Sequence, residues 1–336
     1  MHTIAIKKMN SNQNKILQLR EVVYQSLDPL IREDYCLLDV PNHYNIGDQL
    51  ICEGELAYLR RLPFKRQYMA NLTYCDFKRL PSSGLILLHG GGNFGDIWRW
   101  HQQFKTRVIS AFPGSKIIIF PQTVYYKDNN LLRRDAQLFN QHPDLTICAR
   151  DTKSYDILKT HFTNNTILLV PDMAFCLNLE KYNSNAETNK TLILKRQDKE
   201  LSQSFDEAAL KDRIRTRKRI EVRDWPPMER NVSTKVSNAL SKADDIISKL
   251  LVKKPGFKSI INHSYGFKRR DLSKWYMLQG INFINNYDEI YTTRLHGYIL
   301  SVLLDKKVNL IDNSYGKNST FYNTWMKEFE NSSLIN

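Results

Sequence analysis

Short apolar runs alternate with amphipathic stretches through the first half of the chain. Five runs rich in Ile, Leu and Val, each bounded by Gly, Pro, Asn or Asp, predict strands at residues 36–40, 85–90, 116–121, 145–150 and 166–172. Their apolar character is continuous rather than alternating, as in strands that are covered on both faces of a parallel sheet. The intervening stretches predict helices at 48–62, 100–111, 130–140 and 151–161. This repetition of strand and helix indicates a doubly wound α/β domain.

The second half repeats the pattern less regularly. Strands are predicted at 191–196, 258–263, 281–286, 289–294 and 307–312, and helices at 234–252, 271–279, 296–304 and 318–330. A highly charged stretch from 197 to 230 is interpreted as an inserted loop and helix. We therefore predict an α/β fold with two Rossmann-like domains facing a cleft, formed by residues 1–175 and residues 176–336.

Composition narrows the class of protein. A chain of 336 residues that is 42% hydrophobic can bury two cores, and none of its apolar runs approaches the roughly 18 residues of a membrane-spanning helix. The five cysteines are scattered and form no CxxC pair, which favours buried free thiols in a reducing cytosol over a disulfide or zinc framework. Because the N-terminus also lacks the apolar segment of a signal peptide, we expect a cytoplasmic protein.

Basic residues exceed acidic ones, 49 against 35, which gives a net charge of +14. Such an excess attracts polyanions. Its densest part is KDRIRTRKRIEVR, residues 211–223, which we call the basic segment. A solvated surface and a docking site for anionic lipid headgroups or a lipid diphosphate both account for it. No DNA- or RNA-binding module accompanies it, so no nucleic-acid partner is expected.

Three predicted strand ends combine glycine, small polar residues and charge, at the places where open α/β sheets bind ligands. The first is NHYNIGDQL, residues 42–50, in which Asp48 is either a helix N-cap or a carboxylate facing the cleft. The second is HGGGNFGDIW, residues 89–98, whose glycines allow close backbone approach and whose amides favour an anion. Its spacing is neither a Walker nor a GxGxxG motif, and a tight structural turn is the alternative.

The third strand end is TTRLHGYIL, residues 292–300, in which Arg294 ends a strand and His296 opens a helix. Arginine can hold a carboxylate or phosphate with two parallel hydrogen bonds, and histidine can move a proton near neutral pH. The pair Arg150-Asp151 follows another predicted strand, although a surface arginine beside a helix cap is the alternative there. Lys317 lies at a further turn before a predicted helix.

Taken in order, these motifs resemble the polysaccharide pyruvyl transferase family. The resemblance extends from about residue 36 to about residue 326, and it is carried by NIGDQLI, LHGGGNFGDIW, FPQTVYY, ICARD, LVPDMAF, TTRLHG and DNSYGKNSTFYNTW. It implies a two-domain fold like that of the GT-B glycosyltransferases. It also implies transfer of an enolpyruvyl-derived group from phosphoenolpyruvate to two hydroxyls of a hexose, as a pyruvate ketal. By the same resemblance, Arg294 and His296 bind the donor and catalyse the reaction, and Arg150 matches a further family arginine.

The chemistry of phosphoenolpyruvate suggests which groups hold the donor. Its carboxylate and phosphate need several cations or amides in one place. The predicted donor-binding residues are Arg150, Arg294, Lys317, Gly90, Gly91 and Gly92. His296 is the predicted general acid.

A base is needed for the sugar hydroxyls, and Asp48 and Asp96 are the candidates. The predicted acceptor-binding residues are Asn45, Asn93 and Trp98. No metal or cofactor is expected, because phosphate leaves without phosphoryl transfer.

The acceptor side is predicted in residues 1–175 and the donor side in residues 176–336. The expected acceptor is a sugar of a surface or capsular polysaccharide precursor on a lipid carrier, which would bring the protein to the inner face of the plasma membrane. Two other classes stay open. One is a glycosyltransferase of the same architecture with a nucleotide-sugar donor, and the other is a non-catalytic protein that binds polyanions through the basic segment.

Overall fold

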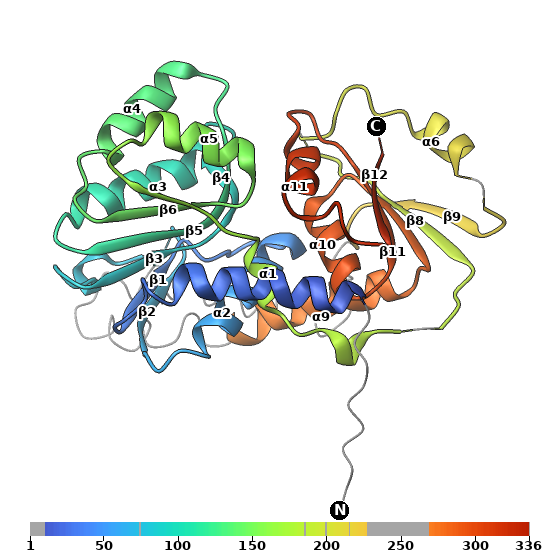
Figure 1. Cartoon of the computed structure of the whole chain (residues 1–336), viewed down its shortest axis with the longest axis horizontal. Helices are drawn as coiled ribbons and strands as arrows, with labels where there is room; N and C mark the ends of the chain where they lie inside the picture. Colours follow the sequence, from blue (N-terminus) through green and yellow to red (C-terminus); the bar gives the residue numbers. More distant parts are fainter. Residues whose placement is uncertain are drawn as a thin grey trace, which may run out of the picture.

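The computed structural model describes residues 11–73, 75–184, 186–198, 200–214, 216–226 and 269–335. In these residues the chain builds two β-sheets, each covered by helices, which lie beside each other (Figure 1). Every strand pair in both sheets is parallel. The α/β class and the parallel sheets predicted from the sequence are therefore confirmed.

The N-terminal sheet has seven strands in the order β2-β1-β3-β5-β6-β7, with β4 paired to β5. Strands β1, β3 and β6 are buried along their whole length, which explains their continuous apolar sequences. The strands of this sheet are β1 (Tyr35–Leu38), β2 (Arg66–Ala70), β3 (Leu85–Leu88), β4 (Gly91–Gly95), β5 (Lys116–Tyr125), β6 (Leu145–Ala149) and β7 (Thr166–Leu169).

Helices cover both faces of this sheet. On one face, apolar side chains of three helices, among them Phe104, Phe139 and Leu158, form one core with the strands. These helices are α3 (Arg99–Ala111), α4 (Asn129–Phe139) and α5 (Thr152–His161). On the other face a second core contains side chains of α1 (Ser11–Leu27) and α2 (Ile46–Leu59).

The C-terminal sheet has five strands in the order β12-β11-β10-β8-β9. Its strands are β8 (Lys190–Leu194), β9 (Arg219–Arg223), β10 (Glu289–Thr292), β11 (Lys307–Ile311) and β12 (Ser332–Ile335). One face carries the largest core of the C-terminal half, and the opposite face carries a small cluster around Leu210. The helices are α9 (Arg269–Asn285), α10 (Leu295–Leu303) and α11 (Lys317–Trp325) on the first face and α6 (Glu207–Arg213) on the second.

Two N-terminal helices contribute to the cores of both sheets. In α1, Val23 packs in the core of the N-terminal sheet, whereas Leu19 packs in the core of the C-terminal sheet. In α2, the neighbours Ile51 and Leu50 divide in the same way. Figure 1 shows α1 running across both halves of the molecule. The division of the chain into two domains at residues 175 and 176 stays a prediction.

Most predicted elements form within a few residues of their expected bounds, but two assignments were wrong. Residues 281–286 were predicted as a strand, but residues 281–285 form the end of α9, whose side chains Ile281 and Ile284 pack in the core. The charged stretch from 197 contains not only the short helix α6 but also strand β9 at the sheet edge. The predicted helix at 234–252 and strand at 258–263 lie outside the described residues.

Several elements carried no sequence prediction, namely α1, β2, β4, β12 and the three short 3-10 helices at Phe77–Arg79, Met173–Cys176 and Glu180–Tyr182. All five cysteines are free thiols, four of them buried and Cys75 half-buried. Among the described helices, none combines the length and the apolar character needed to cross a membrane.

Candidate active site

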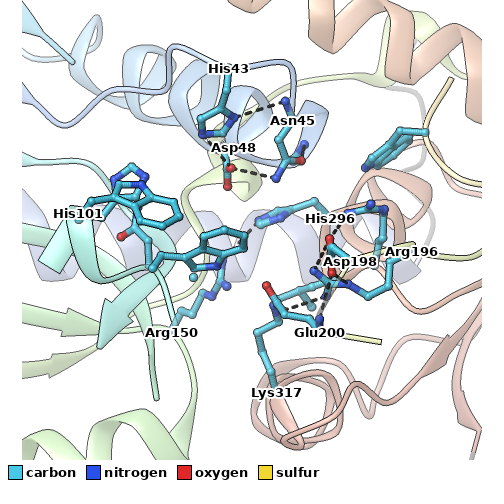
Figure 2. Close-up of a pocket in the computed structure, with 18 residues that line it drawn as sticks. His43, Asn45, Asp48, His101, Arg150, Arg196, Asp198, Glu200, His296 and Lys317 are labelled. Atoms are coloured by element: carbon cyan, nitrogen blue, oxygen red, sulfur yellow. Dashed lines mark hydrogen bonds and ion pairs between the residues drawn. The ribbon is translucent and has the colours of Figure 1, made fainter. Parts of the chain in front are cut away.

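A pocket of about 400 Å³ lies where the loops of the two sheets meet. Residues from both halves of the chain line it, and Figure 2 shows His43, Asn45 and Asp48 on one side and Arg196, Glu200 and Lys317 on another, with His296 between them. The pocket brings together most of the residues predicted from the sequence, namely Asn45, Asp48, Gly92, Asn93, Trp98, Arg150, Arg294, His296 and Lys317.

The first strand end supplies the N-terminus of α2. Asn45, not Asp48, caps this helix, because its Oδ1 accepts a hydrogen bond from the amide of Gly47. Asp48 lies in the first turn, where its carboxylate accepts a hydrogen bond from Asn45 Nδ2 at 2.9 Å and faces His43 Nε2 at 3.5 Å. Freed from a capping role, the Asp48 carboxylate is directed into the pocket (Figure 2).

The glycine-rich motif is a strand rather than an anion-binding loop. The amide of Gly90 is buried and donates to Glu55 Oε1 at 2.8 Å, so it is not available to a donor anion. Gly91 pairs with Gln122 of β5 and lies outside the pocket lining. Gly92 does line the pocket, and a Cβ there would lie 3.3 Å from Arg150 Nη2. The predicted role of the amides thus fails for Gly90, and the glycine at 92 leaves room beside Arg150.

Asp96 does not reach the pocket. Its Oδ2 accepts hydrogen bonds from the amides of Lys127 and Asp128, at 2.7 and 2.8 Å, and so holds the turn after β5. It lines a separate groove together with Tyr125 and Tyr315. The position of Asp96 therefore contradicts the predicted role as base for the acceptor.

Arg150 and His296 line the pocket, and both contact the buried Asp172 behind it. Arg150 follows β6 and is 1% exposed; its Nη1 donates to Asp172 Oδ2 at 2.7 Å, and its Nε donates to Thr123 Oγ1. His296, in the first turn of α10, places Nε2 3.3 Å from Asp172 Oδ2 and 3.4 Å from Arg150 Nη1. Burial alone would raise the pKa of Asp172, but His296 and Arg150 hold it well below its usual value. Asp172 is thus an ionised link between an N-terminal arginine and a C-terminal histidine.

Arg294 ends the loop after β10 and forms the N-cap of α10. Its Nε and Nη2 donate to the two oxygens of Asp224, at 2.5 and 2.7 Å, and its Nη1 lies 3.6 Å from Asp198. This is the two-pronged geometry that guanidinium forms with carboxylates and phosphates.

Lys317, the first residue of α11, belongs to a second cluster of charges. Its Nζ donates to Glu200 Oε2 at 2.5 Å, and the same oxygen accepts from Arg196 Nη1 at 2.8 Å. Burial alone would raise the pKa of Glu200, but Lys317 and Arg196 hold it well below its usual value. Burial lowers the pKa of Lys317, an effect that Glu200 opposes. Arg196 also donates to both oxygens of Asp198, so two cations and two carboxylates balance in this wall of the pocket.

A third cluster supports the opposite wall. Asp39 is fully buried at the end of β1; its oxygens lie 2.8 Å from His101 Nδ1 and 2.9 Å from Lys105 Nζ. Lys105 also donates to Asn93 Oδ1 at 2.7 Å. Although burial opposes ionisation, Lys105 and His101 lower the pKa of Asp39 to about 2. One carboxylate thereby orients two pocket residues, His101 and Asn93.

Histidines also determine the charge of Asp48. Burial would raise its pKa, but the imidazoles of His43, His296, His89 and His101 lower it. Asp48 is therefore ionised at neutral pH and can accept a proton or a hydroxyl hydrogen bond.

Sequence reasoning missed Arg196, Asp198, Glu200, Asp224, Trp225, His43, His101 and Asp172 as neighbours of the pocket. For the first three a signal was present, since RQDKE follows a predicted strand and charged residues at the carboxyl ends of parallel strands face the ligand site. In the described part of the chain, no three His, Cys, Asp or Glu side chains form a group that could hold a metal ion. The expectation that no metal is needed stays a prediction.

Comparison with known proteins identifies the family. The model of one protein family, polysaccharide pyruvyl transferase, matches residues 45–315, which include His296, Arg294 and Arg150. The chain belongs to the polysaccharide pyruvyl transferase family. The resemblance predicted from the seven motifs is thus confirmed.

Relatives of this pyruvyl transferase family member span almost its full length. It is 29% identical to the Bacillus subtilis protein named "Putative pyruvyl transferase EpsO", over 96% of this chain and 95% of that one. It is 28% identical to "Pyruvyl transferase 1" of Schizosaccharomyces pombe, over 86% of this chain and 69% of that one. The crystal structure of a functionally uncharacterised Klebsiella pneumoniae protein shares the fold, with a TM-score of 0.61 at 21% identity over 98% of this chain and 100% of that chain.

Proposed function

We propose that the protein transfers the enolpyruvyl-derived group of phosphoenolpyruvate to two hydroxyls of a hexose, forming a pyruvate ketal and releasing phosphate. The observation that carries this proposal is the meeting of Arg150 and His296, whose side-chain nitrogens lie 3.4 Å apart although 146 residues separate them. Arg150 can bind an anionic donor and His296 can move a proton. Both line one pocket of a chain that belongs to the polysaccharide pyruvyl transferase family.

Arg150, Arg294 and Lys317 are the proposed donor-binding residues. Phosphoenolpyruvate carries a carboxylate and a phosphate on three carbons, so it needs more than one cation within a short distance. Nη2 of Arg150 has no hydrogen-bond partner among the described residues and lies beside Gly92, where no side chain blocks it. Lys317 Nζ approaches the same glycine, at 3.8 Å from the place of a Cβ. These nitrogens supply donors for the anionic groups of phosphoenolpyruvate.

In the proposed reaction His296 gives a proton to the methylene carbon of the donor. The carbon that bears the phosphate then becomes electrophilic, and an acceptor hydroxyl oxygen bonds to it while losing its proton to a base. The bond from this carbon to the phosphate oxygen then breaks, and a second hydroxyl of the same sugar bonds to the carbon while its proton passes to the leaving phosphate. The proton taken by the base returns to His296 and completes the cycle. Asp48 is the proposed base, because its carboxylate is ionised and lines the pocket. A proton carrier in α10 and an ionised carboxylate in α2 thus line the same pocket.

Aromatic side chains support a sugar acceptor. Trp98 and Trp100 line the pocket in an edge-to-face pair with ring centres 5.3 Å apart, and Trp100 is 51% exposed. Indole rings cover the apolar face of a sugar while leaving its hydroxyls to polar groups. Asn93, held by Lys105, offers such a group on the same wall. We propose this wall, with Asn45, as the acceptor side.

We also propose that the acceptor is lipid-linked and that the protein contacts an anionic membrane. The basic segment forms the end of α6 and the edge strand β9. Parts of its charge are balanced, since Lys211 pairs with Glu207, Lys218 pairs with Asp288, and Arg219 lies 3.6 Å from Glu221. The remaining exposed basic side chains would supply the attraction to anionic lipid, at about 1 kcal/mol each.

Mass spectrometry of the glycan made with and without the protein tests the reaction. We expect a mass gain of one pyruvic acid less one water in its presence, and no such gain would refute the proposal. Two substitutions separate the roles of the residues. Arg294→Lys keeps the charge but loses the fork, so the KM for phosphoenolpyruvate should rise about tenfold or more. His296→Gln should leave donor binding nearly unchanged and lower turnover by about 10²–10⁴.

A further inference from the structure

Carboxylates already occupy the cations of the pocket. Four side chains that are cationic at neutral pH line it, and five carboxylates line it or bond to these cations. The cations are Arg150, Arg196, Arg294 and Lys317, and the carboxylates are Asp48, Asp172, Asp198, Glu200 and Asp224. Without protonated histidines the pocket therefore has no excess of positive charge, although its proposed donor is an anion. A donor anion can form a full ion pair with one of these cations only when the carboxylate already paired with that cation moves away.

In Arg294, as in Arg196, every guanidinium nitrogen faces a carboxylate. Nε and Nη2 of Arg294 face Asp224, at 2.5 and 2.7 Å, and Nη1 faces Asp198 at 3.6 Å. A carboxylate or phosphate of the donor would use these same nitrogens in the same geometry. Asp224 thus holds the place that an anionic ligand of Arg294 would take.

Asp224 is held less firmly than Asp172, the buried carboxylate that pairs with Arg150. Apart from Arg294, its described hydrogen-bond partner is the amide of Trp225, at 2.7 Å, and its side chain is 20% exposed at the end of the edge strand β9. Asp172, by contrast, is 1% exposed and bonds Arg150 and the amide of Ala174. The pair with Arg294 is therefore exchangeable, whereas the pair with Arg150 is fixed by its surroundings.

We propose that Asp224 is a built-in counter-anion that phosphoenolpyruvate displaces from Arg294. The proposal rests on the proposed function, because it takes Arg294 as a donor-binding residue. Asp224 keeps the guanidinium neutralised and oriented while the site is free, and it competes with the donor and with the released phosphate for the same nitrogens. When Arg294 is mostly paired with Asp224, only a fraction of the protein has a free guanidinium. The apparent dissociation constant for phosphoenolpyruvate is then the intrinsic constant divided by that fraction. Asp224 therefore weakens anion binding and speeds the release of phosphate.

Calorimetric titration of the full chain with phosphoenolpyruvate tests this idea. If Arg294 is free about a tenth of the time, Asp224→Asn and Asp224→Ala should bind the donor about tenfold more tightly, and inorganic phosphate should show the same trend. Glu221→Gln is the matched control, since it removes one negative charge from β9, the strand that Asp224 follows, at a side chain that bonds Tyr287 rather than Arg294. Its donor affinity should stay that of the unmodified protein.

Arg294→Ala separates failure of this inference from failure of the proposed function. If Arg294→Ala binds phosphoenolpyruvate as well as the unmodified protein does, Arg294 is not a donor-binding residue and the donor site is assigned wrongly. If Arg294→Ala loses affinity while both Asp224 variants bind unchanged or more weakly, Asp224 only positions Arg294 and the counter-anion is refuted. Thermal melting accompanies each titration. Should both neutral variants fail to fold, Asp224→Glu decides. Its longer side chain displaces the carboxylate relative to Arg294, so the counter-anion role predicts a changed affinity for phosphoenolpyruvate. An unchanged affinity would refute that role.

Discussion

The first turn of α2 should determine where the proposed acid of the reaction stands. A Cβ built on Gly47 would lie 2.8 Å from His296 Nδ1 and 3.0 Å from both Cβ and Cγ of the same histidine. Non-bonded heavy atoms prefer separations of about 3.5–4.0 Å, so the imidazole of a Gly47→Ala variant must move by about 0.5–1 Å. We therefore expect alanine here to displace His296 rather than to disturb the helix.

Two effects of this substitution have opposite signs. Alanine is more favourable than glycine within a helix by about 0.8–1 kcal/mol, so α2 itself should gain stability. A catalytic group that is misplaced by about 1 Å can cost about 10²-fold in rate. We predict that Gly47→Ala lowers turnover about a hundredfold while the protein stays folded.

Phosphate release per folded molecule, measured beside thermal melting, checks this prediction. The control is the same substitution in a His296→Ala background, where the ring is absent and the new methyl group meets no imidazole. There we expect a melting temperature at or above that of His296→Ala alone. Normal turnover in a folded Gly47→Ala protein would refute the steric argument, and so would an equal loss of stability in both backgrounds.

Further predictions concern the charged clusters and the basic segment. Asp39→Asn leaves the fully buried Lys105 without its carboxylate and should cost about 3–5 kcal/mol of unfolding free energy in urea titrations. Because the pKa of Asp39 is lowered to about 2, its stabilisation is present above its ordinary pKa near 4 and is lost as the pH falls towards 2, which acid unfolding of the two proteins would measure. Glu200→Gln removes the carboxylate that raises the pKa of Lys317, so Lys317 should lose its proton at a lower pH. As the pH is raised, the KM for phosphoenolpyruvate should therefore begin to rise earlier in this variant than in the unmodified protein. Neutralising the exposed arginines of the basic segment should weaken binding to anionic vesicles and reduce its salt dependence, and an unmodified protein that ignores such vesicles would exclude the membrane contact.

The local sequence was sufficient to predict strands that are covered on both faces of a sheet. The inner strands β3, β6 and β8 contain continuous apolar runs, so their place was evident before their partners were known. Residues 281–286 show the limit of this reasoning. A short run containing two isoleucines and a phenylalanine fits a strand or a buried helix equally well, and only packing against neighbouring helices decides between them. The edge strands β9 and β12 were missed because an exposed edge needs no apolar run.

The site divides along the same line. Arg150 and Arg294 were predicted because they follow recognisable strands, and His296 because it opens the next helix; the family resemblance pointed to the same three residues. Their partners were not, because ion pairs such as Arg294 with Asp224 join residues 70 positions apart and depend on the tertiary fold. The misassigned Asp96 shows the converse, since a Gly-Asp pair shared with Gly47-Asp48 suggested a common role, yet its carboxylate serves two backbone amides instead.

The placement of α1 has a mechanical consequence. Leu19 of this helix packs in the core of the C-terminal sheet, and Val23 packs in the core of the N-terminal sheet. Between them, Arg20 donates hydrogen bonds to the carbonyls of Phe175 and Leu177, where the chain crosses from one sheet to the other. The helix acts as a strut across the connection that would otherwise serve as a hinge. Any wide opening of the two halves would have to pull Leu19 or Val23 out of an apolar core. We therefore expect the two halves to keep nearly the same relative position while substrate enters and product leaves. The rate of turnover should then depend on side chains that exchange partners and not on a movement of the halves.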